Sequence, residues 1–210
     1  MKIDNIEIFF QHSNLGGLEI MMPVVWESTS VALSAVKLKE LNEFYTFFVN
    51  EMDCGKECIG FHFADATDWE KDNIIENHIE CYFEFADKTD ILHKITFFKI
   101  AVAYAENYIA HYPEVANPEF LALVEQLKRK IALHNFAQRL NNKTTEIKTL
   151  STRRPLLVRE KIELDFLQKI AAADNLETLQ SIENELISTP TDPELIKQLQ
   201  HLLAEKKAFY

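Results

Sequence analysis

The sequence has few glycines, few cysteines and no long apolar run. Only four glycines occur among 210 residues, and none forms the Gly-rich loop that cradles phosphate groups in nucleotide-binding proteins. The three cysteines are sparse and odd in number, which suits reduced thiols better than a disulfide framework. The most apolar stretch, residues 95–112, is interrupted by charged and polar side chains. It therefore predicts a buried helix rather than a membrane span.

Basic side chains are also scarce. Lys and Arg number 22 against 33 Asp and Glu, so the formal net charge is -11. A phosphate backbone repels such a chain, and we expect neither nucleic acid nor a membrane as a direct partner. Asp4 and Glu7 fall where a signal peptide needs apolar residues, so we expect a cytoplasmic protein.

Hydrophobic residues make up 47% of the chain and include 15 Phe, enough to bury a core without metals or disulfides. Alternation of apolar and polar side chains predicts four strands, over residues 2–10, 18–26, 59–63 and 75–85. Pro23 places the second strand at an edge or at a bulge. Between the second and third strands, helical spacing predicts one helix, capped by Ser28, Thr29 or Ser30 and ending near Cys54 and Gly55.

From Asp90 onwards the apolar period becomes helical. Asp90 is expected to cap a central helix that stops before Pro113, and Asn117 with Pro118 opens the next helix. Residues 141–152 are polar and carry no apolar stripe, which is typical of a linker. Helices resume at Pro155, and the last two are expected to begin with an Asp174–Glu177 capping box and with Asp192–Pro193.

These patterns predict an α+β fold: an N-terminal, mostly antiparallel sheet of about four strands packed on helices, followed by an all-helical C-terminal half that ends in a helical hairpin. The expected organisation is an acidic α+β domain over residues 1–140, a polar linker over 141–152 and a helical subdomain over 153–210. Charge follows this division, because residues 1–112 hold 19 acidic and 8 basic side chains whereas residues 113–210 hold 14 of each. The acidic character therefore belongs to the α+β part.

No motif for metal binding or catalysis stands out. Zinc ligands can be drawn only from widely spaced thiols and imidazoles, namely Cys54, Cys58, His62, His78 and Cys81. Cys58 and His62 would lie about 13 Å apart along a strand, too far for proton transfer. We therefore expect no metal, no cofactor and no enzymatic activity.

An acidic segment around Trp69 is the most distinctive local feature. It lacks the glycine and the terminal acid of a calcium loop, so the alternatives are a hydrated surface loop or an interface in which the indole is the anchor. The fourth predicted strand, over residues 75–85, is expected to have one face exposed to solvent. The residues that we expect to bind a partner are Asp65, Asp68, Trp69, Glu70, Asp72, Glu80, Tyr82 and Glu84.

The leading hypothesis is a protein-binding inhibitor that presents an acidic face to a basic partner. Small, acidic α+β chains of this kind are typical of bacterial immunity proteins, which neutralise basic nuclease toxins; this analogy of type transfers no residue. One alternative is a helical adaptor or homo-oligomer formed through the stripe of Leu195, Leu199, Leu202 and Leu203. Another is a small-molecule sensor with a pocket between the sheet and the central helix, lined by Phe97, Tyr104 and Tyr108.

Overall fold

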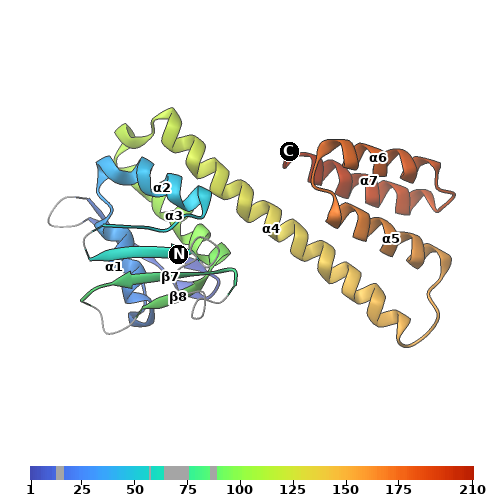
Figure 1. Ribbon diagram of the computed structural model, residues 1–210, viewed down its shortest axis with the longest axis horizontal. Coiled ribbons are helices and arrows are strands. Elements are labelled where there is room, and N and C mark those ends of the chain that lie inside the picture. The colour runs from blue at the N-terminus through green and yellow to red at the C-terminus, as the bar shows by residue number, and fades with distance from the viewer. Residues whose placement is uncertain (13–16, 57, 64–75, 86–88) are drawn as a thin grey trace. The chain divides into compact units, whose positions relative to one another are not determined.

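A computed structural model describes residues 1–12, 17–56, 58–63, 76–85 and 89–210. The chain divides into two compact units, residues 1–131 and residues 132–210, and the division falls inside helix α4 (Pro118–Ser151). Unit 1 contains all the strands of the described residues, and unit 2 is helical (Figure 1). The α+β class and the antiparallel pairing predicted from the sequence are confirmed.

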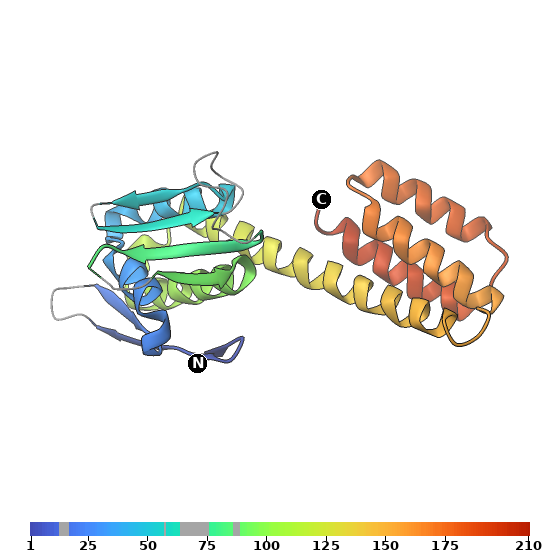
Figure 2. The ribbon, with the colours of Figure 1, turned by 60° about the horizontal axis from the view of Figure 1, so that its bottom comes forward.

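The main sheet of unit 1 has four antiparallel strands in the order β5-β6-β7-β8 (Figure 2). Their bounds are β5 (Cys54–Lys56), β6 (Ile59–Phe63), β7 (His78–Phe83) and β8 (Asp90–His93). The prediction of a strand over 59–63 is confirmed, and β7 lies within the predicted strand at 75–85. Alternate side chains of β6 and β7, such as Phe61, Phe63, Ile79 and Cys81, are buried against the helices of unit 1.

The expected capping role of Asp90 is wrong. Asp90 lies in β8, opposite Cys81 of β7, and it is buried. Its Oδ2 accepts hydrogen bonds from the backbone N and the hydroxyl of Thr29 in α1 (Glu27–Ala35), at 2.6 and 2.8 Å. The central helix α3 (Lys94–His111) begins four residues later, where His93 Nδ1 accepts from the backbone N of Ile95. Pairing with β7 and the bond to α1 thus override the local capping tendency of an Asp.

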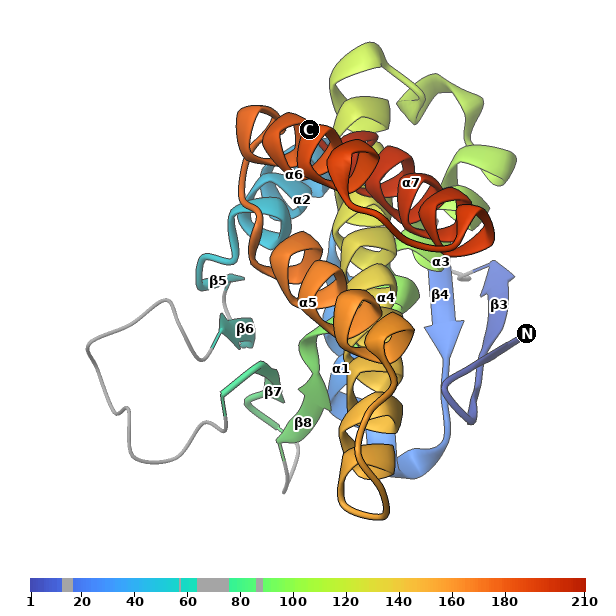
Figure 3. The same ribbon diagram turned by 90° about the vertical axis from the view of Figure 1, so that its right-hand side faces the viewer.

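The N-terminal segment does not form one strand over 2–10. It turns back at Asp4 and Asn5, whose φ values are 45° and 73°. The turn joins β1 (Lys2–Ile3) to β2 (Ile6–Glu7), and a second hairpin then pairs β3 (Phe9–His12) with β4 (Leu18–Met21), as Figure 3 shows. The strand predicted over 18–26 is too long: β4 ends at Met21, and the 3-10 helix η1 (Val24–Trp26) follows Pro23, which cannot donate to a ladder.

The prediction of a single helix that ends near Cys54 and Gly55 is wrong, because Cys54 and Gly55 lie in β5. The helical segment before them is broken into three pieces: α1, the 3-10 helix η2 (Leu38–Glu40) and α2 (Leu41–Asn50). Thr29 lies inside α1 instead of capping it. Ser30 donates to the carbonyl of Ile20, and Ser34 accepts from the backbone N of Ile20 at 3.0 Å. These hydroxyls bind one edge of β4, a tertiary role that competes with capping.

The prediction of a buried central helix is confirmed in α3. Phe97 and Tyr104 are fully buried. The Tyr104 hydroxyl donates to the carbonyl of Leu18 at 2.8 Å, and the hydroxyl of Tyr45 in α2 donates to the carbonyl of Ala101 at 2.5 Å. Both phenols therefore satisfy their polar atoms inside an aromatic core. A 3-10 helix, η3 (Pro113–Val115), separates α3 from α4.

Residues 141–151 are not a loop, because they form the last turns of α4. Phe136, Leu140 and Ile147 lie on one side of this helix and are buried in the core of unit 2. The polar residues Lys143 and Thr144 interrupt the stripe between them, which makes the segment resemble a linker in the sequence. The helix continues because its apolar stripe is covered by the other helices of unit 2.

The other helices of unit 2 are α5 (Val158–Ala172), α6 (Leu176–Ser188) and α7 (Pro193–Lys207). Asp192 caps α7 as predicted, whereas α6 is capped by Asn175, whose Oδ1 accepts from the backbone N of Thr178, and not by Asp174. None of the described helices combines the length and the apolar character that crossing a membrane requires.

Candidate protein-binding face

The four-stranded sheet has a second face, opposite the core, on which polar and aromatic side chains gather. We call it the outer sheet face and define it by Gly60, His62, Glu80, Tyr82 and Ile91. Gly60 lies opposite Tyr82 in the strand register, and Glu80 lies between His62 and Ile91. All four side chains are at least partly exposed, whereas the neighbours of His62, Glu80 and Ile91 along the strands are buried. The alternation predicted for β7 is therefore present, with Glu80 and Tyr82 on its wet side.

The side chain of Tyr82 reaches across two glycines. Gly55, Gly60 and Tyr82 form one row across β5, β6 and β7. A Cβ placed on Gly60 would come within 2.0–2.4 Å of the Tyr82 ring and hydroxyl, and one placed on Gly55 would lie 3.1 Å from that hydroxyl. The ring thus occupies space that any other residue at position 60 would fill.

His62 stacks against the Tyr82 ring. Its ring is nearly parallel to that of Tyr82, with centroids 5.0 Å apart and planes 13° apart. On the other side, His62 Nδ1 lies 3.2 Å from Asp53 Oδ2. Asp53 is itself held by Phe63, whose backbone N donates to Oδ1 at 2.7 Å. The imidazole is therefore fixed at two points, by the carboxylate and by the stacked phenol.

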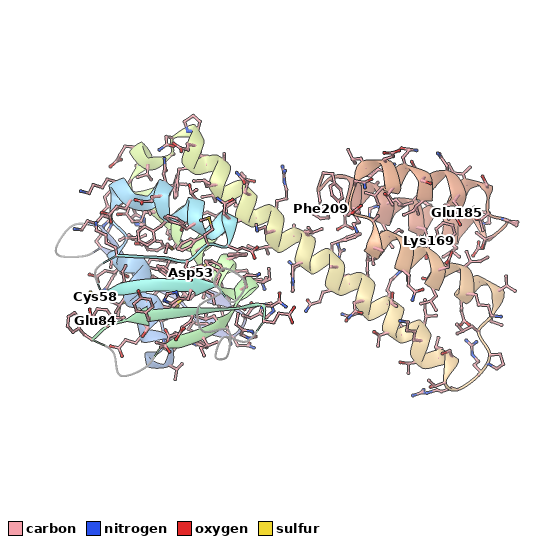
Figure 4. All side chains as sticks on the ribbon, in the orientation of Figure 1. Asp53, Cys58, Glu84, Lys169, Glu185 and Phe209 are labelled. Atoms are coloured by element: carbon pink, nitrogen blue, oxygen red, sulfur yellow. The ribbon has the colours of Figure 1, made fainter. Side chains whose placement is uncertain are left out.

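Carboxylates surround the phenol. Burial raises the pKa of the Tyr82 hydroxyl above its usual value, and the negative charges of Glu84, Asp53 and Glu80 raise that pKa further. Glu84 is exposed just beyond the end of β7, where its backbone N donates to the carbonyl of Cys58 at 2.7 Å (Figure 4). The potential around the ring is thus negative, which favours a cationic neighbour.

The charge balance of unit 1 strengthens this potential. Residues 1–131 contain 22 acidic and 11 basic side chains, a net charge of -11, and residues 132–210 contain 11 of each. Most described lysines of unit 1 form ion pairs within the unit: Lys56 with Glu40, Lys94 and Lys130 with Glu51, Lys99 with Asp4, and Lys128 with Glu106 and Glu125. Neither Glu80 nor Glu84 forms an ion pair with a described residue. Their charges are therefore available to a partner.

The structure brings two of the predicted partner-binding residues, Glu80 and Tyr82, onto one face and places Glu84 beside it. The other five predictions, Asp65, Asp68, Trp69, Glu70 and Asp72, lie outside the described residues. His62 and Gly60 were not predicted as part of the site. Their signal in the sequence is a Gly and a His at the polar positions of an otherwise apolar strand, IGFHF.

Metal binding and thiol chemistry find no support in the described part of the chain. It contains no group of three or more His, Cys, Asp or Glu side chains that could hold a metal ion. Cys54 and Cys81 are buried, and burial raises both thiol pKa values, that of Cys54 to about 12. Thiols of this kind stay protonated and unreactive at neutral pH.

The two alternative sites are filled by the chain itself. Phe97, Tyr104 and Tyr108 are buried in the core of unit 1. Leu195, Leu199 and Leu203 of the predicted adaptor stripe are buried in the core of unit 2, and Leu202 packs against it. A surface cavity of about 460 Å³ does lie elsewhere in unit 1, lined by Lys37, Lys39, Leu41, Asn42, Glu114, Val115 and Asn117.

Comparisons with known proteins give no match: no family model matches the chain, and no curated protein or solved structure matches it. The functional argument therefore rests on the residues of this chain.

Proposed function

We propose that this chain is a protein-binding inhibitor of the immunity type, which binds and neutralises a basic partner such as a nuclease toxin through the outer sheet face and the adjoining Glu84. The observation that carries the proposal is the fixed aromatic pair of Tyr82 and His62, flanked by carboxylates with no cationic partner among the described residues. A large, rigid aromatic group with a charged rim is the usual composition of an interface hot spot.

The negative charge of unit 1 bears on the rate at which the partner would associate. A net charge of -11 concentrated in residues 1–131 would accelerate the encounter with a cationic protein and make association sensitive to salt. A nuclease carries a basic groove because it binds phosphates. An acidic protein seated in that groove excludes the substrate without needing any catalytic group of its own.

The test is an affinity capture from the native source, with the full chain as bait at low salt and elution at high salt. Three baits are compared: the wild type, a face variant with Glu80→Lys and Glu84→Lys, and a control variant with Glu43→Lys and Glu146→Lys. Glu43 and Glu146 are exposed on α2 and α4, so both variants change the net charge equally.

The proposal requires a basic protein that the wild type and the control capture, that the face variant loses, and whose activity the wild type inhibits. Equal capture by the face and control variants would show that only net charge matters and would remove this face from the interface. Recovery of the chain alone by all three baits would favour self-association and contradict the proposal.

A further inference from the structure

We infer that the outer sheet face takes an arginine side chain of its partner, with the guanidinium stacked on the exposed face of the Tyr82 ring and hydrogen-bonded to Glu80 or Glu84. This inference rests on the proposed function and deepens it, because it names the chemical group that the face selects. Three observations carry it: the packing of the ring over Gly60, the placement of the carboxylates and the imidazole that stacks on the ring.

The Tyr82 ring packs against the backbone because Gly60 and Gly55 have no side chains. Tyr82 lies against Gly60 and reaches Gly55, so its inner side rests on the backbone of β6 and β5. A tyrosine above ordinary residues would instead stand away from the sheet. The ring is partly exposed, so the part of its π face that His62 leaves open can receive an approaching group, and an aromatic π face is the surface on which planar cations stack.

A glutamate precedes Tyr82 by two residues and another follows it by two residues. Glu80 precedes Tyr82 by two residues in β7 and therefore shares its face, about 7 Å away along the strand. Glu84 follows by two residues, exposed in the turn after β7. A guanidinium centred over the phenol thus has an acceptor within reach in either direction, and the negative charges that act on the Tyr82 hydroxyl act on it as well.

Arginine fits this arrangement better than lysine does. Its guanidinium is planar, weakly hydrated and carries N–H donors at its rim, so it can stack and donate to a carboxylate at the same time. A lysine ammonium is compact and strongly hydrated, and it gains from the carboxylates but little from the flat ring. His62, held against Asp53, stacks on the phenol ring and so fixes the position of that ring.

The experiment measures binding of two fluorescein-labelled peptides of equal length and charge, nona-arginine and nona-lysine, to the full chain at low salt by fluorescence polarisation. The quantity of interest is the ratio of the two Kd values. The wild type should prefer nona-arginine, and Tyr82→Leu should reduce that preference by about two- to five-fold, the size of an exposed cation–π contact. Tyr82→Phe should keep the preference.

Two further variants control for folding and for exposed aromatic surface. Gly60→Ala should act like Tyr82→Leu, because its Cβ displaces the ring from its seat. Phe9→Leu changes an aromatic side chain that is 62% exposed in β3, away from the outer sheet face, and should leave the ratio unchanged. Tryptophan fluorescence confirms that each variant is folded.

The outcomes separate this inference from the proposed function. Suppose that Glu80→Lys with Glu84→Lys weakens the binding of both peptides while Tyr82→Leu leaves the ratio of the two Kd values unchanged. The inference of an arginine site on Tyr82 is then overturned, whereas the proposed acidic binding face is retained. If neither peptide responds to the charge reversals, the face is not the binding surface and both proposals are overturned.

Discussion

Substitution of Gly60 by Ala tests the packing of Tyr82 directly. The added Cβ would lie 2.0 Å from Cε1 and 2.3 Å from Cζ of Tyr82, so the ring must leave its position. Displacement forfeits the stacking with His62, worth about 0.5–1.5 kcal/mol, and adds the strain of repacking, about 1–3 kcal/mol. Removing a glycine from a strand returns about 0.5–1 kcal/mol. We therefore expect Gly60→Ala to lower the free energy of unfolding of unit 1 by about 2 kcal/mol, the middle of the range that these contributions span.

The same substitution should behave differently once the ring is gone. In a Tyr82→Ala background the space above position 60 is open, so Gly60→Ala should be neutral or stabilising by up to about 1 kcal/mol. The double-mutant cycle then has a coupling energy of about 1–3 kcal/mol. Gly55→Ala is the contrasting variant, because its Cβ would lie 2.8 Å from the carbonyl oxygen of Ile59, a backbone atom that the removal of Tyr82 does not move.

Urea denaturation followed by tryptophan fluorescence provides the assay. Both tryptophans of the chain, Trp26 and Trp69, belong to residues 1–131, so their emission reports on unit 1 even if unit 2 unfolds separately. Equal destabilisation by Gly60→Ala with and without Tyr82 would refute the reasoning, since it would show that the ring does not occupy the space above this glycine.

Three further predictions concern buried polar groups. Asp90→Ala should lower the free energy of unfolding by about 2–3 kcal/mol, because it leaves the buried backbone N of Thr29 without an acceptor. Asp90→Asn retains an acceptor oxygen and should lower the free energy of unfolding by less than half as much in the same urea assay. Burial raises the pKa values of Tyr45 and Tyr104; the native state then holds its phenolic protons while the unfolded chain loses them above about pH 10. Stability should therefore fall as the pH rises from 10 to 11.5, less steeply in Tyr45→Phe. In unit 2, the buried ammonium of Lys206 donates to two carbonyl groups at the end of α5 at 2.6 and 2.9 Å, so Lys206→Met should speed hydrogen exchange in the last turn of α5 and cost about 1–3 kcal/mol.

The sequence predicts elements well where the deciding interactions are local. The helix that stops before Pro113 and the helices that begin at Pro118 and Pro193 all follow from the fixed φ and the missing N–H of proline. Likewise, the alternation in residues 59–63 reports directly on which side of the strand is buried. In each case the neighbouring residues alone determine the outcome.

Prediction fails where a distant residue decides between two uses of the same side chain. Asp90 has the properties of a helix cap, yet its carboxylate binds Thr29, which lies 61 residues earlier. Asn5 with φ of 73° ends a two-residue strand inside a segment that alternates regularly. The 141–151 segment is helical because Leu140 and Ile147 are buried against helices that come later in the chain. None of these partners can be identified from local periodicity.

The candidate site shows the same limit in a form that matters for function. Glu80 and Tyr82 could be assigned to a wet strand face because they alternate with Ile79 and Cys81. The packing of the phenol over Gly60 could not be predicted, because it depends on the register that places Gly60 opposite Tyr82, 22 residues later in the chain. A scan that replaces only the acidic residues would therefore test the charge of this face and miss its shape. The shape comes from a residue without a side chain, so a methyl group added at Gly60 perturbs the face while every carboxylate stays in place.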